Sequence, residues 1–122
     1  MRNTARNATI ALSLAALFTG ASLMPQVASA SAESAAKGKE VAFDRKKGNC
    51  LACHVVDDGT LPGDIGPPLV AMKARFPDRK KLFNQIYDAT TNNAGTRMPP
   101  FGKNKILSNG EIDEIIDYLY TL

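Results

Sequence analysis

Residues 48–54 read Gly-Asn-Cys-Leu-Ala-Cys-His. This short stretch decides which fold and which cofactor the rest of the chain must accommodate. Cys50 and Cys53 are the only two cysteines of the 122-residue sequence, and His54 is its only histidine. The spacing C-x-x-C-H is the attachment motif of c-type haem, in which both thiols become thioethers and the adjacent imidazole binds iron. The motif therefore predicts one covalently bound haem c, attached through Cys50 and Cys53 and ligated by His54.

Three other uses of the two cysteines are weaker. A thioredoxin-like dithiol would lie beside a βαβ pattern, which is absent from this sequence. A structural zinc site needs four Cys or His ligands, whereas the chain offers three. A disulfide between Cys50 and Cys53 would close a very short loop and stabilise little. None of these alternatives explains the histidine that directly follows Cys53.

Residues 1–30 have the pattern of a cleaved export signal. Arg2 and Arg6 precede a stretch without charge, residues 8–23, and residues 28–30 read Ala-Ser-Ala, the small residues that a signal peptidase accepts. We expect cleavage after residue 30 and a periplasmic domain of residues 31–122 that is not stably inserted in the membrane. A retained membrane anchor is the alternative, although the uncharged stretch is short for a bilayer span.

The charge balance excludes one class of partner. The chain carries 15 Lys and Arg against 12 Asp and Glu, for a net charge of +3. Removal of residues 1–30 would take two arginines and no acidic residue, so the remaining domain is nearly neutral. This is not the strong basic excess of a nucleic-acid-binding protein, and we expect no nucleic-acid partner.

The sequence predicts that residues 31–122 form one small all-α domain. Residues 31–47 are expected to form a helix that ends at Gly48. Residues 77–78, Pro-Asp, open a second helix. Ser108 and Glu111 form a capping box for the last helix. The apolar face of that helix consists of Ile112, Ile115, Ile116 and Leu119.

The segments between the expected helices are long and rich in turn-forming residues. Residues 57–64 should form an exposed loop, and a second long loop carries residues 98–102, Met-Pro-Pro-Phe-Gly. No segment shows the alternation of a β-strand. We therefore expect three to four short helices joined by long loops that wrap around the haem.

A second axial ligand must come from a residue other than histidine. The domain that follows residue 30 contains two methionines, Met72 and Met98. Met98 precedes two prolines that stiffen a long loop, whereas Met72 lies between apolar residues and is expected to fill the core. Met98 is therefore favoured over Met72. A thioether opposite the imidazole raises the reduction potential and leaves no open position, which suits electron transfer rather than bond-making catalysis.

An ordered series of segments gives the chain a family resemblance. It resembles the class I cytochromes c and, more closely, the SoxX family, the monohaem subunits of the SoxAX cytochromes of bacterial sulfur oxidation. Its first and last helices carry Gly38, Phe43 and Tyr118, which fit the class I pattern. The segments that resemble SoxX are residues 48–54, 62–69, 75–79, 96–102, 106–107 and 111–112.

The resemblance implies a function and a ligand set. The resemblance to SoxX implies an electron-accepting subunit with SoxA as its partner. In that family SoxA carries the cysteine that joins thiosulfate to a cysteine of the carrier protein SoxYZ, which is an L-cysteine S-thiosulfotransferase reaction. By this resemblance Cys50 and Cys53 attach haem, His54 and Met98 ligate the iron, and the carbonyl of Pro67 orients His54. Pro67 could equally be a simple turn residue. The chain has no spare cysteine, so it would not catalyse thiosulfate chemistry alone.

Two other functional classes remain open at this stage. One is a free periplasmic carrier that serves an oxidase or reductase as its downstream electron acceptor. The other is a haem sensor or gas-binding protein, which would keep the sixth iron position open. The lysines at positions 46, 47, 103 and 105 could ring an exposed haem edge and steer an acidic partner, or they could only solvate the surface.

Overall fold

The computed structural model describes residues 27–56 and 58–122. The predicted export signal lies for the most part outside these residues, so it stays a prediction. The described chain contains four α-helices: α1 Val27–Phe43, α2 Met72–Arg75, α3 Arg79–Tyr87 and α4 Asn109–Leu119. Two 3₁₀ turns, η1 Cys50–Ala52 and η2 Ala89–Thr91, complete the order α1-η1-α2-α3-η2-α4. No strand occurs in these residues, and the predicted all-α class is confirmed.

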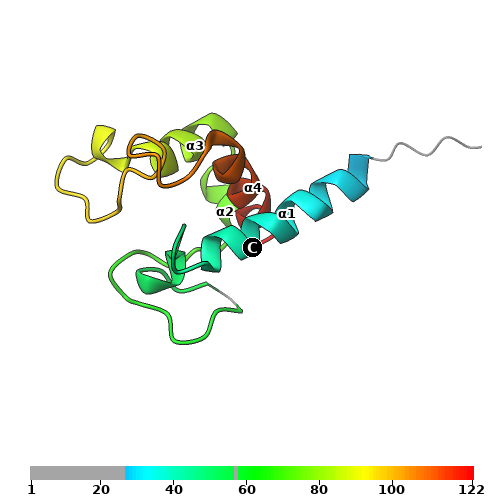
Figure 1. The fold of residues 1–122 in the computed structure, drawn as a ribbon, viewed down its shortest axis with the longest axis horizontal. Helices are drawn as coiled ribbons and strands as arrows, with labels where there is room; N and C mark the ends of the chain where they lie inside the picture. Colours follow the sequence, from blue (N-terminus) through cyan, green and yellow to red (C-terminus); the bar gives the residue numbers. More distant parts are fainter. Residues whose placement is uncertain (1–26, 57) are drawn as a thin grey trace, which may run out of the picture.

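Helices α1 and α4 cross at close range (Figure 1). A Cβ atom on Gly38 of α1 would overlap the backbone carbonyl of Glu114 and lie 2.7 Å from the backbone nitrogen of Ile115 in α4. Only glycine permits this backbone approach. Further along, the rings of Phe43 and Tyr118 meet edge to face at 5.9 Å between centroids. The crossing therefore depends on a missing side chain at one point and an aromatic pair at another.

The predicted end of the first helix was wrong. Helix α1 ends at Phe43, and residues 45–48 form a turn where a last helical turn was expected. The carboxylate of Asp44 accepts a hydrogen bond from the backbone N–H of Lys46 at 2.8 Å, and its carbonyl accepts one from Lys47 at 3.0 Å. Such local bonds to an aspartate compete with helical ones. Gly48 is still at the boundary, where its N–H donates to the carbonyl of Val41 at 3.1 Å.

Helix α4 begins as predicted and contributes more buried residues to the core than any other helix. The hydroxyl of Ser108 accepts from the N–H of Glu111 at 3.2 Å, and the Glu111 carboxylate accepts from the N–H of Ser108 at 2.9 Å. This is the expected capping box. The carboxylate of Glu111 also pairs with Lys47, and this ion pair lowers its pKa to about 2. The predicted apolar face is buried, and it comprises Ile112, Ile115, Ile116 and Leu119.

Helix α3 is tied to α4 through one arginine. The carboxylate of Asp78 caps α3 by accepting from the N–H of Lys80 at 2.9 Å, so the predicted start is confirmed. Arg79 then pairs with Asp113 at 3.1 Å and with Asp117 at 2.6 Å, both on α4. Asp117 also accepts from the hydroxyl of Ser34 in α1 at 2.6 Å. One carboxylate therefore joins the three longer helices.

Candidate haem-binding site

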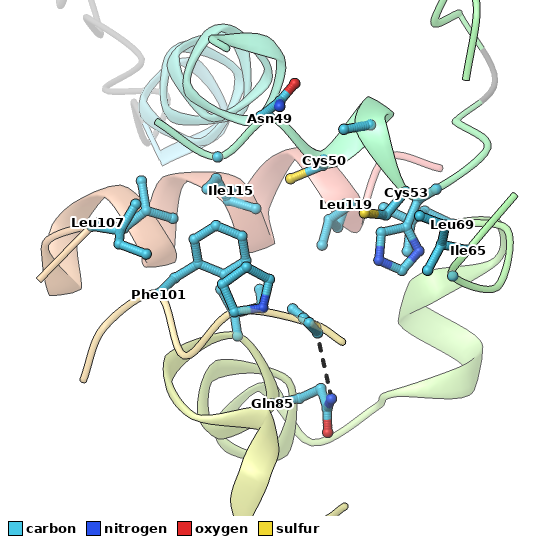
Figure 2. A pocket seen from close by; sticks show the side chains of 18 of the residues that line it. Asn49, Cys50, Cys53, Ile65, Leu69, Gln85, Phe101, Leu107, Ile115 and Leu119 are labelled. Atoms are coloured by element: carbon cyan, nitrogen blue, oxygen red, sulfur yellow. Dashed lines mark hydrogen bonds between the residues drawn. The ribbon is translucent and has the colours of Figure 1, made fainter. Parts of the chain in front are cut away.

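Two long connections, residues 50–71 and 88–108, extend on the same side of the helices, in green and in yellow to orange in Figure 1. Between them and the helices lies a cavity of about 510 Å³, within the range of cofactor sites. Its wall includes Phe101, Leu107, Ile115 and Leu119, whose side chains surround the space in Figure 2. The same cavity is lined by Cys50, Cys53, His54, Pro67 and Met98. All five predicted site residues are thus brought together.

The C-x-x-C-H motif is shaped by the 3₁₀ turn η1. Asn49 precedes this turn in the left-handed region, with φ of 46°. The carbonyl of Cys50 then accepts from the N–H groups of Cys53 at 3.1 Å and of His54 at 2.9 Å. This tight turn brings both thiols and the imidazole to one wall, and Figure 2 shows Cys50 and Cys53 side by side there.

Cys50 and Cys53 are free thiols. Burial in the apolar cavity raises the pKa of the Cys50 thiol to about 11. A dithiol that works by exchange needs a thiolate near neutral pH, whereas this group stays protonated. The raised pKa of Cys50 therefore argues against a thioredoxin-like role, and no disulfide joins the two thiols in this structure.

The imidazole of His54 has a defined orientation. Its Nδ1 lies 2.7 Å from the carbonyl oxygen of Pro67, and because a carbonyl can only accept, Nδ1 carries the proton and donates. In the neutral ring Nε2 is then the nitrogen with the free lone pair, the form in which histidine binds a metal.

Gly66 was missed as a site residue in the sequence. A Cβ atom at this position would lie 2.6 Å from Nδ1 of His54, so the ring packs directly on the Gly66 backbone. The N–H of Gly66 also donates to the carbonyl of Cys53 at 2.7 Å. The Gly-Pro-Pro sequence at residues 66–68 was the available signal, but its contact with the imidazole depends on a fold that returns the chain to η1.

The loop after the motif runs back along it. The N–H of Gly63 donates to the carbonyl of Leu51 at 2.7 Å, and the N–H of Leu69 donates to the carbonyl of Val55 at 2.8 Å. Most described residues between 58 and 64 are exposed, in line with the predicted loop, and residue 57 lies outside the described residues. Asp58 anchors this loop because its carboxylate accepts from the hydroxyl of Tyr118 at 3.0 Å.

The two methionines occupy different places in the cavity wall. Met72 is 3% exposed and belongs to the core, as expected, although it also borders the cavity. Met98 is half-buried on the second long loop, where its backbone N–H donates to the hydroxyl of Thr96 at 3.1 Å. Its sulfur lies 3.8 Å from the side-chain nitrogen of Gln85, the contact drawn as a dashed line in Figure 2. Gln85 is a second site residue that the sequence analysis missed.

The cavity border is positively charged. Five cationic side chains line it, and no Asp or Glu does so in the part of the chain that the structure describes. Of the four lysines considered above, Lys46 and Lys47 lie there, whereas Lys103 and Lys105 do not. Lys103 instead pairs with Asp88 at 2.8 Å and lowers the pKa of that carboxyl. The cations at the border are Arg45, Lys46, Lys47, Arg75 and Arg97.

This donor set fits a haem. It combines an apolar cavity, two thiols on one turn, an imidazole with an unprotonated Nε2 and a thioether, while the cations match the carboxylates that a haem carries. A metal ion held only by protein side chains fits this site less well. Within residues 27–56 and 58–122, no group of three or more His, Cys, Asp or Glu side chains could hold a metal ion.

Comparison with known families agrees with this geometry. The family described as "Cytochrome C oxidase, cbb3-type, subunit III" matches residues 33–119. The chain belongs to this family of c-type cytochromes. The matched region includes the whole C-x-x-C-H turn and every residue placed in the cavity wall. The cytochrome is therefore a haem-binding electron-transfer domain of class I, as the family resemblance implied.

One relative is similar to this chain over part of its length. The cytochrome is 36% identical over 76 residues to a protein of Aquifex aeolicus (strain VF5) named "Uncharacterized lipoprotein". The alignment covers 62% of this chain and 37% of the Aquifex protein, so the chain spans well under half of that relative. Within the described residues of the cytochrome, no helix has the length and apolarity needed to cross a membrane.

Proposed function

We propose that the protein is a periplasmic monohaem cytochrome c whose iron is ligated by His54 and Met98 and whose haem is attached through Cys50 and Cys53. The observation that carries this proposal is the 2.7 Å contact between Nδ1 of His54 and the carbonyl of Pro67, beside two free thiols in one cavity. It leaves Nε2 available for a metal. The name of the Aquifex relative supports a location outside the cytoplasm.

The residues of the cavity define how such a protein would work. The bound haem supplies a one-electron redox centre. Pro67 keeps His54 in a single tautomer and orientation, which also makes the imidazole a better donor. Met98 supplies a thioether, a ligand that favours the reduced metal and raises the potential. The apolar wall would limit water, and iron held by both His54 and Met98 would be suited to electron transfer without bond making.

We further propose that the cytochrome is the electron-accepting subunit of a SoxAX-type complex. The ordered segments from residue 48 to residue 112 support this proposal, and both cysteines lie in the haem cavity. Sulfur chemistry would then take place on a SoxA-like partner. Coupling of thiosulfate to a thiol of the SoxYZ carrier forms one S–S bond and releases one proton and two electrons. The cytochrome would accept these electrons singly and pass them to a downstream acceptor.

The family match favours a second candidate, a free carrier that serves an oxidase. The matching family is described as an oxidase subunit, and residues 33–119 account for nearly all of the domain expected after the signal. Such a carrier would exchange electrons with a terminal oxidase without a SoxA-like protein. Both candidates use the same cavity residues and differ only in the partner.

The experiment that separates them is a pull-down of the tagged cytochrome from the periplasm of cells grown on thiosulfate, analysed by haem staining and mass spectrometry. The SoxAX proposal predicts that a second haem protein is recovered in stoichiometric amount. This protein should be absent from the pull-down when the cells are grown without reduced sulfur. A cytochrome that carries its haem, is recovered alone and is oxidised rapidly by a terminal oxidase would contradict the SoxAX role and support the free carrier.

A further inference from the structure

The sulfur of Met98 has a polar neighbour that the ligand set above does not include. Gln85 lies on α3, is half-buried and lines the cavity. Its side-chain Nε2 lies 3.8 Å from Sδ of Met98 and donates a hydrogen bond to it. A thioether sulfur is a weak acceptor, so this bond contributes little to folding, but it acts directly on the atom proposed as the ligand.

The amide of Gln85 is itself oriented by a second amide. Its Oε1 accepts from Nδ2 of Asn92 at 2.8 Å, and Asn92 follows η2 as its C-terminal cap. Because the oxygen accepts from Asn92, the amide nitrogen of Gln85 is the atom directed toward the sulfur. A reversed amide would place an oxygen against the sulfur lone pairs and two donors against each other. The pair therefore has one favourable arrangement.

The position of η2 is also fixed. Asp88 caps it by accepting from the N–H of Thr90 at 3.1 Å, and the same carboxylate pairs with Lys103. The N–H groups of Gly102 and Lys103 both donate to the carbonyl of Tyr87 at 3.1 Å. These contacts join the end of α3 to the segment just after Met98. These contacts therefore fix the position of the loop that carries Met98 relative to the helix that carries Gln85.

The Met98 side chain needs such a contact. Methionine has three rotatable bonds, and fixing all of them has a cost in conformational entropy. The bond from the Met98 N–H to Thr96 fixes the backbone but leaves the side chain free. In the part of the chain that the structure describes, the hydrogen bond found for the sulfur is the one from Gln85.

We propose that Gln85 is the positioning residue for Met98, which holds the sulfur toward the cavity, and that Asn92 orients the Gln85 amide for this task. The inference rests on the proposed ligation by His54 and Met98. Loss of the Gln85 donor should leave the haem attached and the fold intact but should make the sulfur easier to displace.

The test is competition by imidazole for the sixth position of the oxidised holoprotein, followed by the absorption change. Gln85→Leu should bind imidazole about three- to tenfold more tightly, the range that one weak hydrogen bond supports. Gln85→Glu keeps the size but removes the donor, so it should shift in the same direction. Asn92→Ala should give a smaller shift. Asn84→Leu, an equivalent change at an exposed position of α3, should have wild-type affinity.

A double-mutant cycle separates positioning from a general structural effect. Met98→Ala should itself bind imidazole much more tightly, and in this background Gln85→Leu should cause no further change. A Gln85→Leu effect of the same size without the sulfur would overturn the proposal, as would wild-type affinity in Gln85→Leu alone. Unchanged imidazole affinity in Met98→Ala would instead show that Met98 is not the ligand, a failure of the proposed function that the other two outcomes do not imply.

Discussion

The two proposed iron ligands lie on walls of the cavity that are built differently. We call them the histidine wall, formed by η1, His54, Gly66 and Pro67, and the methionine wall, formed by Gln85, Thr96 and Met98. His54 is held by backbone groups: its own N–H is bonded within the motif, Nδ1 donates to Pro67, and the ring packs on Gly66. Met98 is positioned mainly by side chains, through Thr96 at its backbone and Gln85 at its sulfur. Backbone contacts are cooperative and hard to remove singly, whereas side-chain contacts can be changed one at a time. The histidine wall should therefore determine folding, and the methionine wall should determine ligand strength.

The largest effect is expected when the histidine wall loses its covalent link. The double change Cys50→Ser/Cys53→Ser should give a poorly folded protein, because a small domain without tryptophan depends on the macrocycle for much of its apolar contact. Thermal unfolding by circular dichroism, together with a haem assay of the denatured protein, measures this directly. A variant with an unchanged melting temperature would show that the core is sufficient without the attached group.

A single methyl group should also disrupt the histidine wall. Gly66→Ala would place a Cβ atom 2.6 Å from Nδ1 of His54, and we expect a loss of about 1–3 kcal/mol in the free energy of unfolding. Denaturant titration of the holoprotein measures the loss. The matched control is Gly110→Ala in α4, where a Cβ atom meets nothing within 4 Å, so stability should be unchanged or slightly higher. Equal stability of both variants would contradict the close packing of His54 on Gly66.

The ion pair between Lys47 and Glu111 predicts a pH dependence of stability. Lys47 lowers the pKa of Glu111 from 4.5 to about 2 in the folded protein, so the pair stabilises the fold above pH 4.5 and loses its effect as the pH falls toward 2. Because the Lys47 side chain is exposed to solvent, screening keeps this contribution small. Glu111→Gln should therefore lose less stability than the wild type between pH 5 and pH 2, as followed by urea unfolding. Parallel curves for the two proteins would rule out this contribution.

The smallest effect is expected at the backbone of the methionine wall. Thr96→Val removes the acceptor for the Met98 N–H and should cost about 0.5–1 kcal/mol of unfolding free energy, with the haem retained. Thr60→Val, the same change in the exposed loop, should cost nothing measurable in denaturant titration. A loss above 2 kcal/mol at Thr96 would mean that the methionine wall contributes to folding as strongly as the histidine wall.

The sequence could predict features that depend on neighbours in the chain. The cap at Asp78 and the capping box of Ser108 and Glu111 are local, and both helices begin where they were expected. The C-x-x-C-H motif was identified from its spacing, although its 3₁₀ turn was not predicted. The apolar face of α4 follows from helical spacing and was equally predictable. Pro67 was identified by resemblance, and its carbonyl lies within hydrogen-bond distance of His54.

Features that depend on the three-dimensional path were not predictable. The end of α1 at Phe43 results from side-chain competition at Asp44, which the run of basic residues concealed. The short helix α2 has only four residues and no periodicity to detect. Gly66 and Gln85 acquire their roles only when distant segments meet, 12 residues from His54 and 13 from Met98 respectively. Both contacts need the completed cavity.

The central claim is that both axial positions are filled by side chains of this protein, and carbon monoxide binding tests it most directly. The reduced wild-type protein at neutral pH should show no spectral change under carbon monoxide, because Met98 would occupy the sixth position. Met98→Ala should bind the gas and retain its haem. Avid carbon monoxide binding by the unmutated protein would contradict ligation by His54 and Met98 and would favour a gas-binding or sensor role.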